Sequence, residues 1–475
     1  MAQIGTEAAP LRVAIIGSGP SGFYAAEYLE KQPDLHVEID MFERLPTPFG
    51  LVRGGVAPDH QKIKSVTKLY ERIASKPNFR FYGNVEFGKD VTHDDLVKHY
   101  HAIIYAVGAQ SDRKLNIPGE DLPGSHSATE FVAWYNAHPD FRDRQFDLTQ
   151  ESVAVIGVGN VAMDVARILA RTQEELMQTD IADYAMEALA KSNVKRIYVL
   201  GRRGPAQAAF TNAEIKELGE MAGADIIVAP EEVELDPLSK AYLETGKDPK
   251  AEKNVEILTE YSKRQPTGKP KQVIMRFLVS PVEFIGEKRV EAIKLVKNEL
   301  YEREDGTLRP RPTDQYETIP VGLVFRSVGY RGVPLPGVPF YDRWGTIPNE
   351  KGRVLTDYSD DGQQVIGEYV VGWIKRGPSG VIGTNRPDAL ETVEMLLEDL
   401  AAGKLLSPSA PEAEAVEKLV AERKPDYITF DDWKIIDRLE QERGKAVGRP
   451  RLKFSSVEEV LEALRAAKSN MPAAG

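Results

Sequence analysis

Apolar residues near the start of the chain form a run that ends at a cluster of glycines. Residues 11–16 are apolar except for Arg12, and residues 17–22 read Gly-Ser-Gly-Pro-Ser-Gly. From Phe23 onward, apolar residues recur at the spacing of one helix face. The pattern predicts a buried strand, a tight glycine turn and a helix.

The same order of elements recurs further along the chain. Residues 152–156 are largely apolar, residues 157–162 read Gly-Val-Gly-Asn-Val-Ala, and Val165, Ile168 and Leu169 continue as a helix face. In such a turn the first glycine allows the bend, the second lets backbone approach a pyrophosphate, and the small third residue lets helix and strand pack. The helix N-terminus favours the negative charge. Single glycine turns also occur without a ligand, but two copies favour two dinucleotide sites.

The side chain that ends the next strand distinguishes the two sites. In the first unit the strand at 36–43 ends in Glu43, about 20 residues beyond the turn, where a carboxylate accepts hydrogen bonds from a ribose diol and repels a 2′-phosphate. In the second unit the strand at 196–200 runs into Arg202 and Arg203, and guanidinium forks suit a phosphate. The alternative for the arginines is a solvated turn. The two units therefore predict FAD in the first site and NADPH in the second.

Further apolar segments fit this plan. Residues 101–109 predict a strand that closes on a small-residue turn at Gly108, and residues 323–330 predict another strand. Each would return the chain beside a bound cofactor. Residues 377–383 are again rich in glycine and precede a helical run at 389–400. The N-terminus of that helix is expected to stabilise negative charge on a reduced flavin.

Composition limits the size and the partners of the protein. A chain of 475 residues has room for two or three domains. Its 73 acidic and 61 basic residues give a net charge of −12, the wrong sign for general nucleic-acid binding. The chain contains no cysteine, which excludes disulfides, cysteine-ligated zinc, iron–sulfur clusters and a redox-active dithiol within it. We expect no metal site.

The sequence predicts a cytoplasmic protein without a membrane span. Residues 1–10 lack the basic and apolar regions of a secretory signal. The best candidate for a span, 153–170, is interrupted by Asn160, Asp164 and Arg167. The pattern does not indicate an oligomeric state.

Segments along nearly the whole chain resemble ferredoxin–NADP reductases of the adrenodoxin-reductase type. The segments that carry the resemblance are 15–29, 45–64, 105–124, 155–169, 201–218, 324–332 and 369–385. It implies an α/β fold like that of glutathione reductase, with two Rossmann-like dinucleotide-binding domains. The FAD-binding domain would comprise 1–108 and 329–475, and the NADPH-binding domain, 109–328, would be inserted into it. Residues 1–10 and the tail after Ala467 lie outside the resemblance.

The resemblance also implies the cofactor contacts. The expected flavin contacts are Gly17, Gly19, Pro20, Gly22, Glu43, Leu51, Gly108, Trp373, Gly380 and Val381. The expected NADPH contacts are Gly157, Gly159, Asn160, Val161, Arg202, Arg203 and Glu214. Trp373 would cover the flavin ring, and an ordinary core position is the alternative for it.

The local pattern alone gives His60 and Glu214 ordinary structural roles. His60 follows Asp59, which has the position of a helix N-cap, and Glu214 lies three residues after Thr211 at the spacing of a capping box. The resemblance instead implies that His60 and Glu214 form a catalytic pair where the flavin meets the nicotinamide. We expect the pair to orient the carboxamide or relay a proton, because hydride transfer depends mainly on geometry.

The resemblance implies an enzyme, a ferredoxin–NADP⁺ reductase. It would take a hydride from NADPH onto FAD and pass single electrons to a ferredoxin-type iron–sulfur protein. The absence of cysteine agrees, since the electrons have no dithiol in this chain to reduce. Two alternatives are enzymes: an NADPH diaphorase that reduces quinones, and a flavin monooxygenase, whose fingerprint motif is missing. The third is a dinucleotide-dependent sensor or structural flavoprotein that reduces no acceptor.

An acidic ferredoxin would need a local basic surface on this acidic protein. The candidate patches are Lys62 with Lys64 and Lys68, Lys375 with Arg376, and Arg449 with Arg451 and Lys453. A solvated face is the alternative for each of them. We expect the contact at Lys375 and Arg376, because they follow Trp373 and so should lie near the flavin edge.

Overall fold

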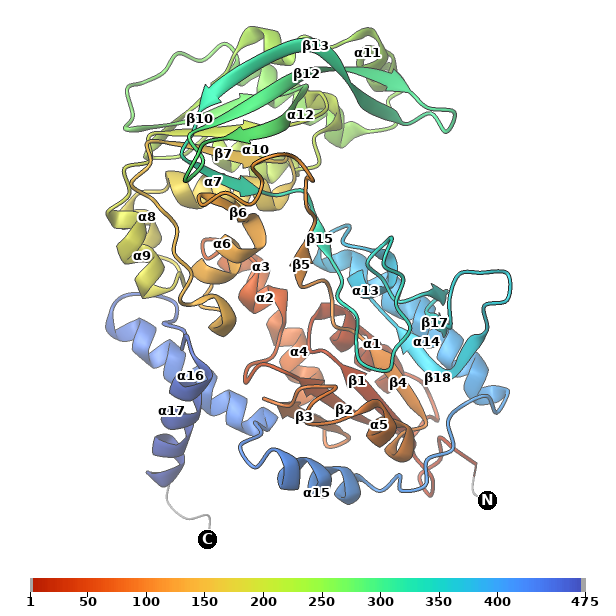
Figure 1. Ribbon diagram of the computed structural model, residues 1–475. Helices are drawn as coiled ribbons and strands as arrows, with labels where there is room; N and C mark the ends of the chain where they lie inside the picture. Colours follow the sequence, from red (N-terminus) through yellow and green to blue (C-terminus); the bar gives the residue numbers. More distant parts are fainter. Residues whose placement is uncertain (1–2, 471–475) are drawn as a thin grey trace.

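The computed structural model describes residues 3–470 as an α/β protein with two large sheets, one in each half of the molecule (Figure 1). Residues 1–2 and 471–475, which the predicted FAD-binding domain includes, lie outside the described residues. The predicted fold class is confirmed, because each glycine turn joins a strand of a parallel sheet to a helix. Within residues 3–470, no helix is long and apolar enough to cross a membrane.

The first sheet has seven strands and carries the first glycine turn. In spatial order they are β16 (Asn349–Glu350), β17 (Arg353–Leu355), β18 (Gln364–Val370), β4 (Ala102–Tyr105), β1 (Leu11–Ile16), β2 (Val37–Glu43) and β3 (Phe79–Gly83). Strands β18 to β3 are parallel, and β16 and β17 add an antiparallel edge. The sheet therefore joins the beginning of the chain to residues beyond 348.

Helices of the same half surround this sheet. They are α1 (Pro20–Glu30), α2 (Leu51–Gly54), α3 (Gln61–Lys64), α4 (Thr67–Ala74), α5 (His93–His99), α13 (Trp373–Arg376), α14 (Asn385–Ala401) and α15 (Ala413–Arg423). Phe23 on α1 stacks on Tyr70 of α4, with ring centroids 4.8 Å apart. Packing of this kind fixes α1 against the sheet, so its N-terminus holds a constant place at the end of β1.

The second sheet has six parallel strands and carries the second turn. Their order is β6 (Ser125–Ser127), β14 (Leu323–Arg326), β7 (Ser152–Ile156), β8 (Arg196–Leu200), β10 (Lys271–Arg276) and β9 (Ala224–Val228). Its helices are α6 (Ala128–Tyr135), α7 (Asn160–Ala170), α8 (Gln173–Leu176), α9 (Asp183–Ala190), α10 (Asn212–Leu218), α11 (Pro237–Glu244) and α12 (Pro249–Tyr261). Helices α8 and α9 lie between α7 and β8 in the chain.

Two smaller sheets complete the arrangement. Strands β11 (Val279–Ile285), β12 (Ala292–Glu302) and β13 (Leu308–Pro320) form an antiparallel sheet above the second sheet (Figure 1). Strands β5 (Ser111–Asp112) and β15 (Tyr330–Arg331) pair where the chain passes between the two halves. The domain boundaries predicted at 108 and 329 adjoin this pair, and they remain a prediction.

The C-terminal helices connect the two halves. Helices α16 (Phe430–Ala446) and α17 (Val457–Ser469) follow the first sheet, yet the segment between them bonds to the second half. Arg449 Nε donates to Thr179 O at 3.0 Å, and Lys453 Nζ donates to Asn136 O at 3.3 Å. The relative position of the halves is therefore fixed by polar contacts as well as by the chain crossings.

Candidate functional site

The first turn is shaped to let a ligand approach its backbone. Gly17 has a φ of +106°, and a Cβ there would lie 2.5 Å from Ala106 O. A side chain at Gly22 would lie 2.6 Å from Gly17 O, so α1 packs closely on the turn. At Gly19 a Cβ would meet nothing within 4 Å. The turn is thus tight on its inner side and open at the N-terminus of α1, where an anion is favoured.

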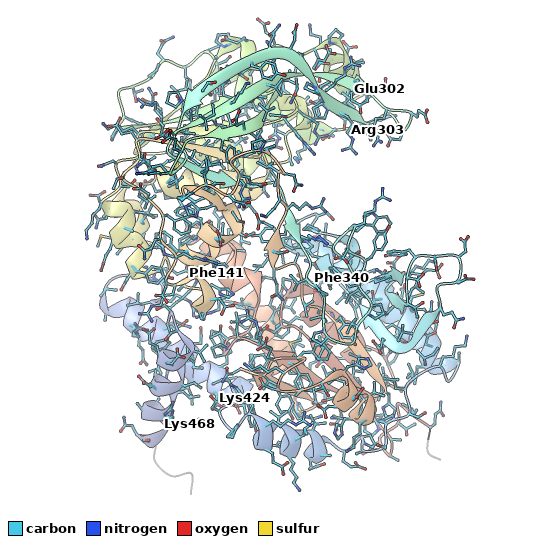
Figure 2. The ribbon with its side chains drawn as sticks, in the orientation of Figure 1. Phe141, Glu302, Arg303, Phe340, Lys424 and Lys468 are labelled. Carbon is cyan, nitrogen blue, oxygen red and sulfur yellow. The ribbon has the colours of Figure 1, made fainter. Side chains whose placement is uncertain are left out.

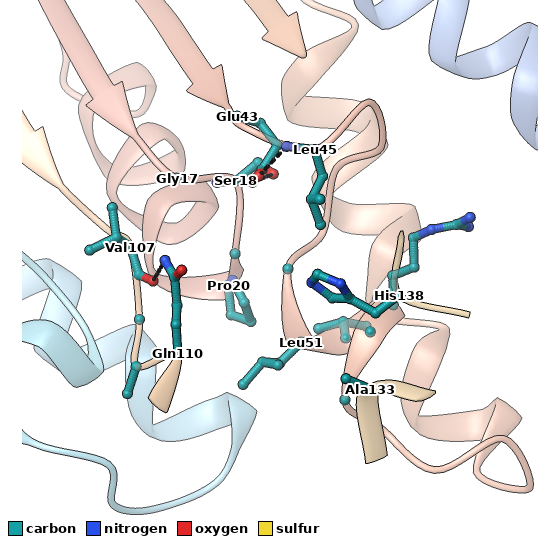
Figure 3. A pocket seen from close by; sticks show the side chains of 18 of the residues that line it. Gly17, Ser18, Pro20, Glu43, Leu45, Leu51, Val107, Gln110, Ala133 and His138 are labelled. Carbon is teal, nitrogen blue, oxygen red and sulfur yellow. Dashed lines mark hydrogen bonds between the residues drawn. The ribbon is translucent and has the colours of Figure 1, made fainter. Parts of the chain in front are cut away.

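Glu43 ends β2 beside this turn, as the sequence predicts. Its Oε2 accepts hydrogen bonds from Ser18 N at 3.2 Å and Ser18 Oγ at 2.6 Å, and its Oε1 accepts from Leu45 N at 2.9 Å (Figure 3). These bonds hold the carboxylate at the edge of the cavity. A carboxylate has about four acceptor positions, so it retains capacity for a donor from a ligand.

A cavity of about 980 Å³ extends from the turn to the second half of the molecule. Among the predicted flavin contacts it is lined by Gly17, Gly19, Pro20, Glu43, Leu51, Gly108, Trp373, Gly380 and Val381. In Figure 3, Pro20 and Leu51 lie on opposite sides of the space below Glu43. The volume is near the upper end for small-molecule sites, which suits an extended dinucleotide. The open backbone and the available carboxylate therefore fit FAD.

Trp373 lies in the cavity wall and is half-buried. Its Nε1 donates to Ser379 O at 3.1 Å, and its ring centroid is 5.3 Å from that of Tyr330. Val381, Ile382 and Gly383 also line the cavity, just before α14 begins. The predicted flat apolar cover and helix N-terminus therefore face the same space.

The second turn repeats the backbone of the first. Gly157 has a φ of +131°, a Cβ there would lie 2.2 Å from Ser327 O, and a Cβ at Gly159 would meet nothing within 4 Å. Asn160 and Val161 line the large cavity. Asn160 Oδ1 accepts a hydrogen bond from Thr211 N at 2.9 Å, which ties the turn to the start of α10.

Arg202 and Arg203 follow β8 and lie outside the large cavity. Arg202 is exposed and Arg203 is half-buried. Burial lowers the pKa of Arg203, and the neighbouring charges of Arg202 and Arg309 lower it further. This uncompensated positive charge, together with the open turn at Gly159, fits the phosphates of NADPH.

The two halves meet at a buried cluster that contains both predicted catalytic residues. His60 Nδ1 lies 3.9 Å from Glu214 Oε1 and 3.9 Å from Asp164 Oδ1. His60 Nε2 is 2.8 Å from Glu217 Oε2. His60, Asp164 and Glu214 line the same cavity as the first turn, so the structure brings the predicted pair together in this cavity. The catalytic role of the pair remains a prediction.

Arg167 organises this cluster, and the sequence argument missed it. The side chain is fully buried and donates to Asp59 at 2.6 Å, to Asp164 at 2.6 Å and to Glu214 at 2.8 Å. A signal was available, because two charged residues of opposite sign, Asp164 and Arg167, interrupt the apolar residues of α7 at a spacing of three. Arg167 holds the pKa of Asp59 well below its usual range, despite burial, with help from Arg171.

The structure contradicts both capping interpretations. His60 itself occupies the N-cap position of α3, and the Asp59 carboxylate bonds Arg167 instead of the helix. Thr211 does accept a hydrogen bond from Glu214 N at 3.3 Å, but the reciprocal bond is absent because Asn160 takes the Thr211 N–H. The Glu214 side chain is therefore available to the cluster.

The surroundings of Glu214 bring its pKa close to neutral pH. Burial and the neighbouring charge of Asp164 raise the pKa of Glu214 to about 7, although Arg167 and His60 act in the opposite direction. Burial opposes protonation of His60, but the hydrogen bond to Glu217 and nearby acidic charges raise its pKa. The site can therefore exchange protons in the neutral range.

The expected docking site at Lys375 and Arg376 is wrong. Lys375 is only 7% exposed, and its Nζ donates to Glu391 at 2.7 Å. Arg376 is half-buried, and its Nη2 donates to Ser379 O at 3.2 Å. Both charges are used within the protein, because α13 packs against α14.

The other two patches are also largely consumed by internal contacts. Lys64 Nζ donates to both carboxylate oxygens of Asp180 at 2.8 Å. Arg449 and Lys453 are buried, and Arg451 pairs with Asp437 and Glu440. Of the eight basic residues named for docking, Lys62 and Lys68 remain exposed.

Comparisons with known proteins agree with this geometry. The family described as pyridine nucleotide-disulphide oxidoreductase matches residues 11–199. The chain is 47% identical over 456 residues to the NADPH-ferredoxin reductase FprA of Mycobacterium leprae, covering 94% of this chain and 97% of that protein. It is 40% identical over 463 residues to the mitochondrial NADPH:adrenodoxin oxidoreductase of Homo sapiens, covering 95% and 92%.

A solved structure shows the same fold over nearly the whole chain. It is that of Mycobacterium tuberculosis FprA in complex with NADPH, which matches with a TM-score of 0.90 at 46% sequence identity. The match covers 96% of this chain and 100% of that chain. The likeness therefore extends over nearly the full length of both chains.

Proposed function

The chain belongs to the NADPH-ferredoxin reductases of the adrenodoxin-reductase type, and from this membership we propose that it oxidises NADPH through FAD and reduces a ferredoxin-type iron–sulfur protein. The observation that carries the proposal is the single cavity that runs from the first glycine turn to the cluster around His60 and Glu214. The chain has no cysteine, so electrons that enter here have no dithiol of its own to reduce. The acceptor must come from outside.

The first half holds FAD, which when bound takes two electrons from NADPH and releases them one at a time. The backbone at Gly19 and the N-terminus of α1 receive the pyrophosphate, and Glu43 accepts hydrogen bonds from the ribose. Trp373 covers the ring system and excludes water. The N-terminus of α14 faces the same end of the cavity and favours negative charge there.

The second half holds NADPH. The backbone at Gly159 receives the pyrophosphate, while Asn160 is kept in place by its bond to Thr211. Arg202 and Arg203 bind the 2′-phosphate and so favour NADPH over NADH, which lacks this phosphate. These roles rest on the open turn and on the uncompensated positive charge beyond β8.

His60 and Glu214 orient the reacting rings. Arg167 fixes Glu214 through a 2.8 Å bond to Oε2, and Oε1 faces His60. A carboxyl whose pKa is about 7 can donate to or accept from a carboxamide near neutral pH. The pair is therefore a positioning device, and it can move one proton without a large change in the cluster.

Steady-state reduction of a purified acidic ferredoxin, compared with a neutral quinone at the same NADPH concentration, tests the proposal. We expect ferredoxin reduction to fall as salt rises, because the Debye length shrinks from about 10 Å at 0.1 M to about 3 Å at 1 M. Quinone reduction controls for salt effects on NADPH binding and should barely respond. Turnover with quinone alone would indicate a diaphorase, and no turnover with either would indicate a sensor. The cytoplasmic location remains a prediction, which cell fractionation would test.

A further inference from the structure

A third guanidinium shares the surroundings of Arg202 and Arg203. Arg309 lies near the start of β13, on the antiparallel sheet that covers this half of the molecule. Two hydrogen bonds fasten that sheet to the arginine loop. Asn298 Nδ2 donates to Arg202 O at 2.9 Å, and the N–H of Leu278, the residue before β11, donates to Arg203 O at 3.0 Å. The loop and the sheet therefore form one surface.

The positive charge of Arg309 affects the pKa of Arg203. After burial itself, the charges of Arg202 and Arg309 both lower the pKa of the Arg203 guanidinium. Such influence is largely screened beyond about 10 Å in ordinary buffers, so the three cations occupy one small region. Their mutual repulsion opposes this arrangement unless an anion balances it.

None of the three arginines forms an ion pair with a carboxylate within residues 3–470. Arg203 Nη2 makes a long 3.5 Å contact to Gln207 O, and Nε of Arg309 is buried with no hydrogen-bond partner. In the turn before β13, the Asp305 carboxylate accepts hydrogen bonds from Thr307, which lower its pKa. The charges of Arg303 and Arg309 lower this pKa further, but neither arginine forms an ion pair with Asp305. The unpaired donor and the surplus charge both point to a ligand with several acceptor oxygens.

The neighbouring arginine on the same strand shows the usual alternative. Arg311 lies two residues along β13 on the same face, is exposed, and pairs with Glu299 at 2.6 Å. At the end of this hairpin, Glu302 and Arg303 are exposed (Figure 2). Because Arg311 on the same strand does form an ion pair, the location of Arg309 on this hairpin does not explain why it has no carboxylate partner.

We propose that Arg309 is the third cation of the site that recognises the 2′-phosphate of NADPH. The inference rests on the proposed function and adds to it a specificity-determining residue from a separate sheet. Arg202 and Arg203 approach the phosphate from the end of β8, and Arg309 approaches it from β13. A phosphate held from two elements is recognised by shape as well as by charge, because each guanidinium offers its donors in a fixed plane.

Direct binding of nucleotide fragments to the FAD-loaded protein tests this assignment without reference to turnover. The probes are adenosine 2′,5′-bisphosphate, which carries the 2′-phosphate, and adenosine 5′-monophosphate, which lacks it. By titration calorimetry, Arg309→Ala should weaken the bisphosphate about tenfold and leave the monophosphate unchanged, since one charge-assisted bond is lost at a partly exposed site. Arg309→Lys should fall between Arg309→Ala and wild type. KM for NADPH should rise with little change in kcat.

Arg311→Ala is the matched control and should bind both probes as wild type does. The melting temperature of Arg309→Ala without nucleotide should equal or exceed that of wild type, because a like-charge repulsion is removed. Equal affinity of Arg309→Ala and Arg311→Ala for the bisphosphate would overturn the inference, as would a parallel loss of monophosphate binding. If wild type itself binds both probes equally, the proposed choice of NADPH fails, which is a different result.

Discussion

The two glycine turns have the same backbone and opposite electrostatic surroundings. Gly17 and Gly157 both have a positive φ, and each lies against a backbone carbonyl, that of Ala106 for Gly17 and that of Ser327 for Gly157. Gly19 and Gly159 both face open space. The third position differs, since Gly22 packs closely on its own turn whereas Ala162 carries a Cβ. One local structure therefore serves two pyrophosphates.

The strand after each turn carries the difference in charge. β2 ends in Glu43, whose carboxylate is bonded to Ser18 and Leu45. β8 ends at Leu200, and the loop after it carries Arg202 and Arg203, which have no carboxylate partner among the described residues. The backbone makes a dinucleotide site, and the next strand end selects the dinucleotide. The comparison yields predictions in which each half is altered while the other serves as its control.

Replacing the first glycine of either turn should have the largest effect. Wild type is expected to purify yellow with one FAD per chain and no FMN. In Gly17→Ala, a Cβ 2.5 Å from Ala106 O, added to the cost of about 1–2 kcal/mol for left-handed backbone, should remove most of the FAD. Gly157→Ala should keep its FAD and lose NADP⁺ binding. Flavin absorbance per chain and calorimetry with NADP⁺ measure the two outcomes.

A substitution at a glycine away from both sites serves as a control for backbone strain alone. Gly246 has a φ of +63°, and a Cβ there would meet nothing within 4 Å. Gly246→Ala should therefore retain both cofactors despite its own backbone cost. Loss of FAD from Gly157→Ala would show that the turns do not act separately.

The next effect concerns the choice of nucleotide. Changing Arg202 and Arg203 together to Ala should remove most of the preference for NADPH over NADH, a contribution of about 2–3 kcal/mol or roughly 30- to 150-fold. The ratio of kcat/KM for the two nucleotides measures it, and FAD content should not change. A double variant that discriminates as wild type does would mean that the phosphate is held elsewhere.

A reciprocal change in the first half sharpens the contrast. Glu43→Gln should weaken FAD binding about tenfold, because an amide replaces a charged acceptor, and should leave the NADPH-to-NADH ratio unaltered. A change in that ratio would indicate that Glu43 acts on the second site as well.

The elements around the turns could be predicted because their signals are local. Strands β1, β7 and β8 begin and end at the residues expected. Each is a largely apolar run that stops immediately before a glycine. The predicted strand at 101–109 ends earlier, at Tyr105, where the chain leaves the sheet to pass the first turn. An apolar run in the sequence predicts where a strand lies, and tertiary contacts determine the residue at which it ends.

The surface could not be predicted in the same way. Lys64, Lys453 and Lys375 are basic residues with ordinary neighbours in sequence, but their partners come from other segments, as Asp180 does for Lys64. The role of Arg309 is hidden for the same reason, because β13 meets the loop after β8 only in the fold. Ion pairs between residues that are far apart in the sequence produce no periodic pattern from which they could be predicted.

A smaller effect is expected where the two halves meet. His60→Gln and Glu214→Ala should each slow flavin reduction by NADPH about tenfold, with little loss of FAD, because each loosens the orientation of the rings. Their 3.9 Å contact and shared cluster predict a double variant less impaired than the product of the single effects. Stopped-flow absorbance measures all three. Glu220→Gln, an exposed change just beyond α10, should leave the rate unaltered.

The outcome that would contradict this pairing is independent action of the two residues. Rates of the double variant equal to the product of the single effects would mean that His60 and Glu214 serve separate steps. The bond between Arg167 and Glu214 would then be a structural contact rather than part of a positioning device.

Stability should also depend on pH through Glu214. Because the pKa of Glu214 is about 7 in the fold and near 4.5 in the unfolded chain, the fold binds this proton more tightly. The contribution of Glu214 to the free energy of unfolding is therefore greatest below about pH 4.5, falls as pH rises toward 7, and is constant above that. His60 and Asp164 have raised pKa values and act in the same direction, whereas the lowered pKa of Glu217 acts against them.

Subtraction isolates the part that belongs to Glu214. Urea unfolding of wild type and Glu214→Gln at intervals from pH 4.5 to 8 should show wild type losing stability relative to the variant up to about pH 7, and a constant difference beyond it. The amide cannot ionise, so the variant retains only the slopes of its neighbours. A difference that is flat throughout would place the Glu214 carboxylate in its charged form, bound to Arg167 at every pH tested, and would leave the junction between the halves without a proton to exchange near neutrality.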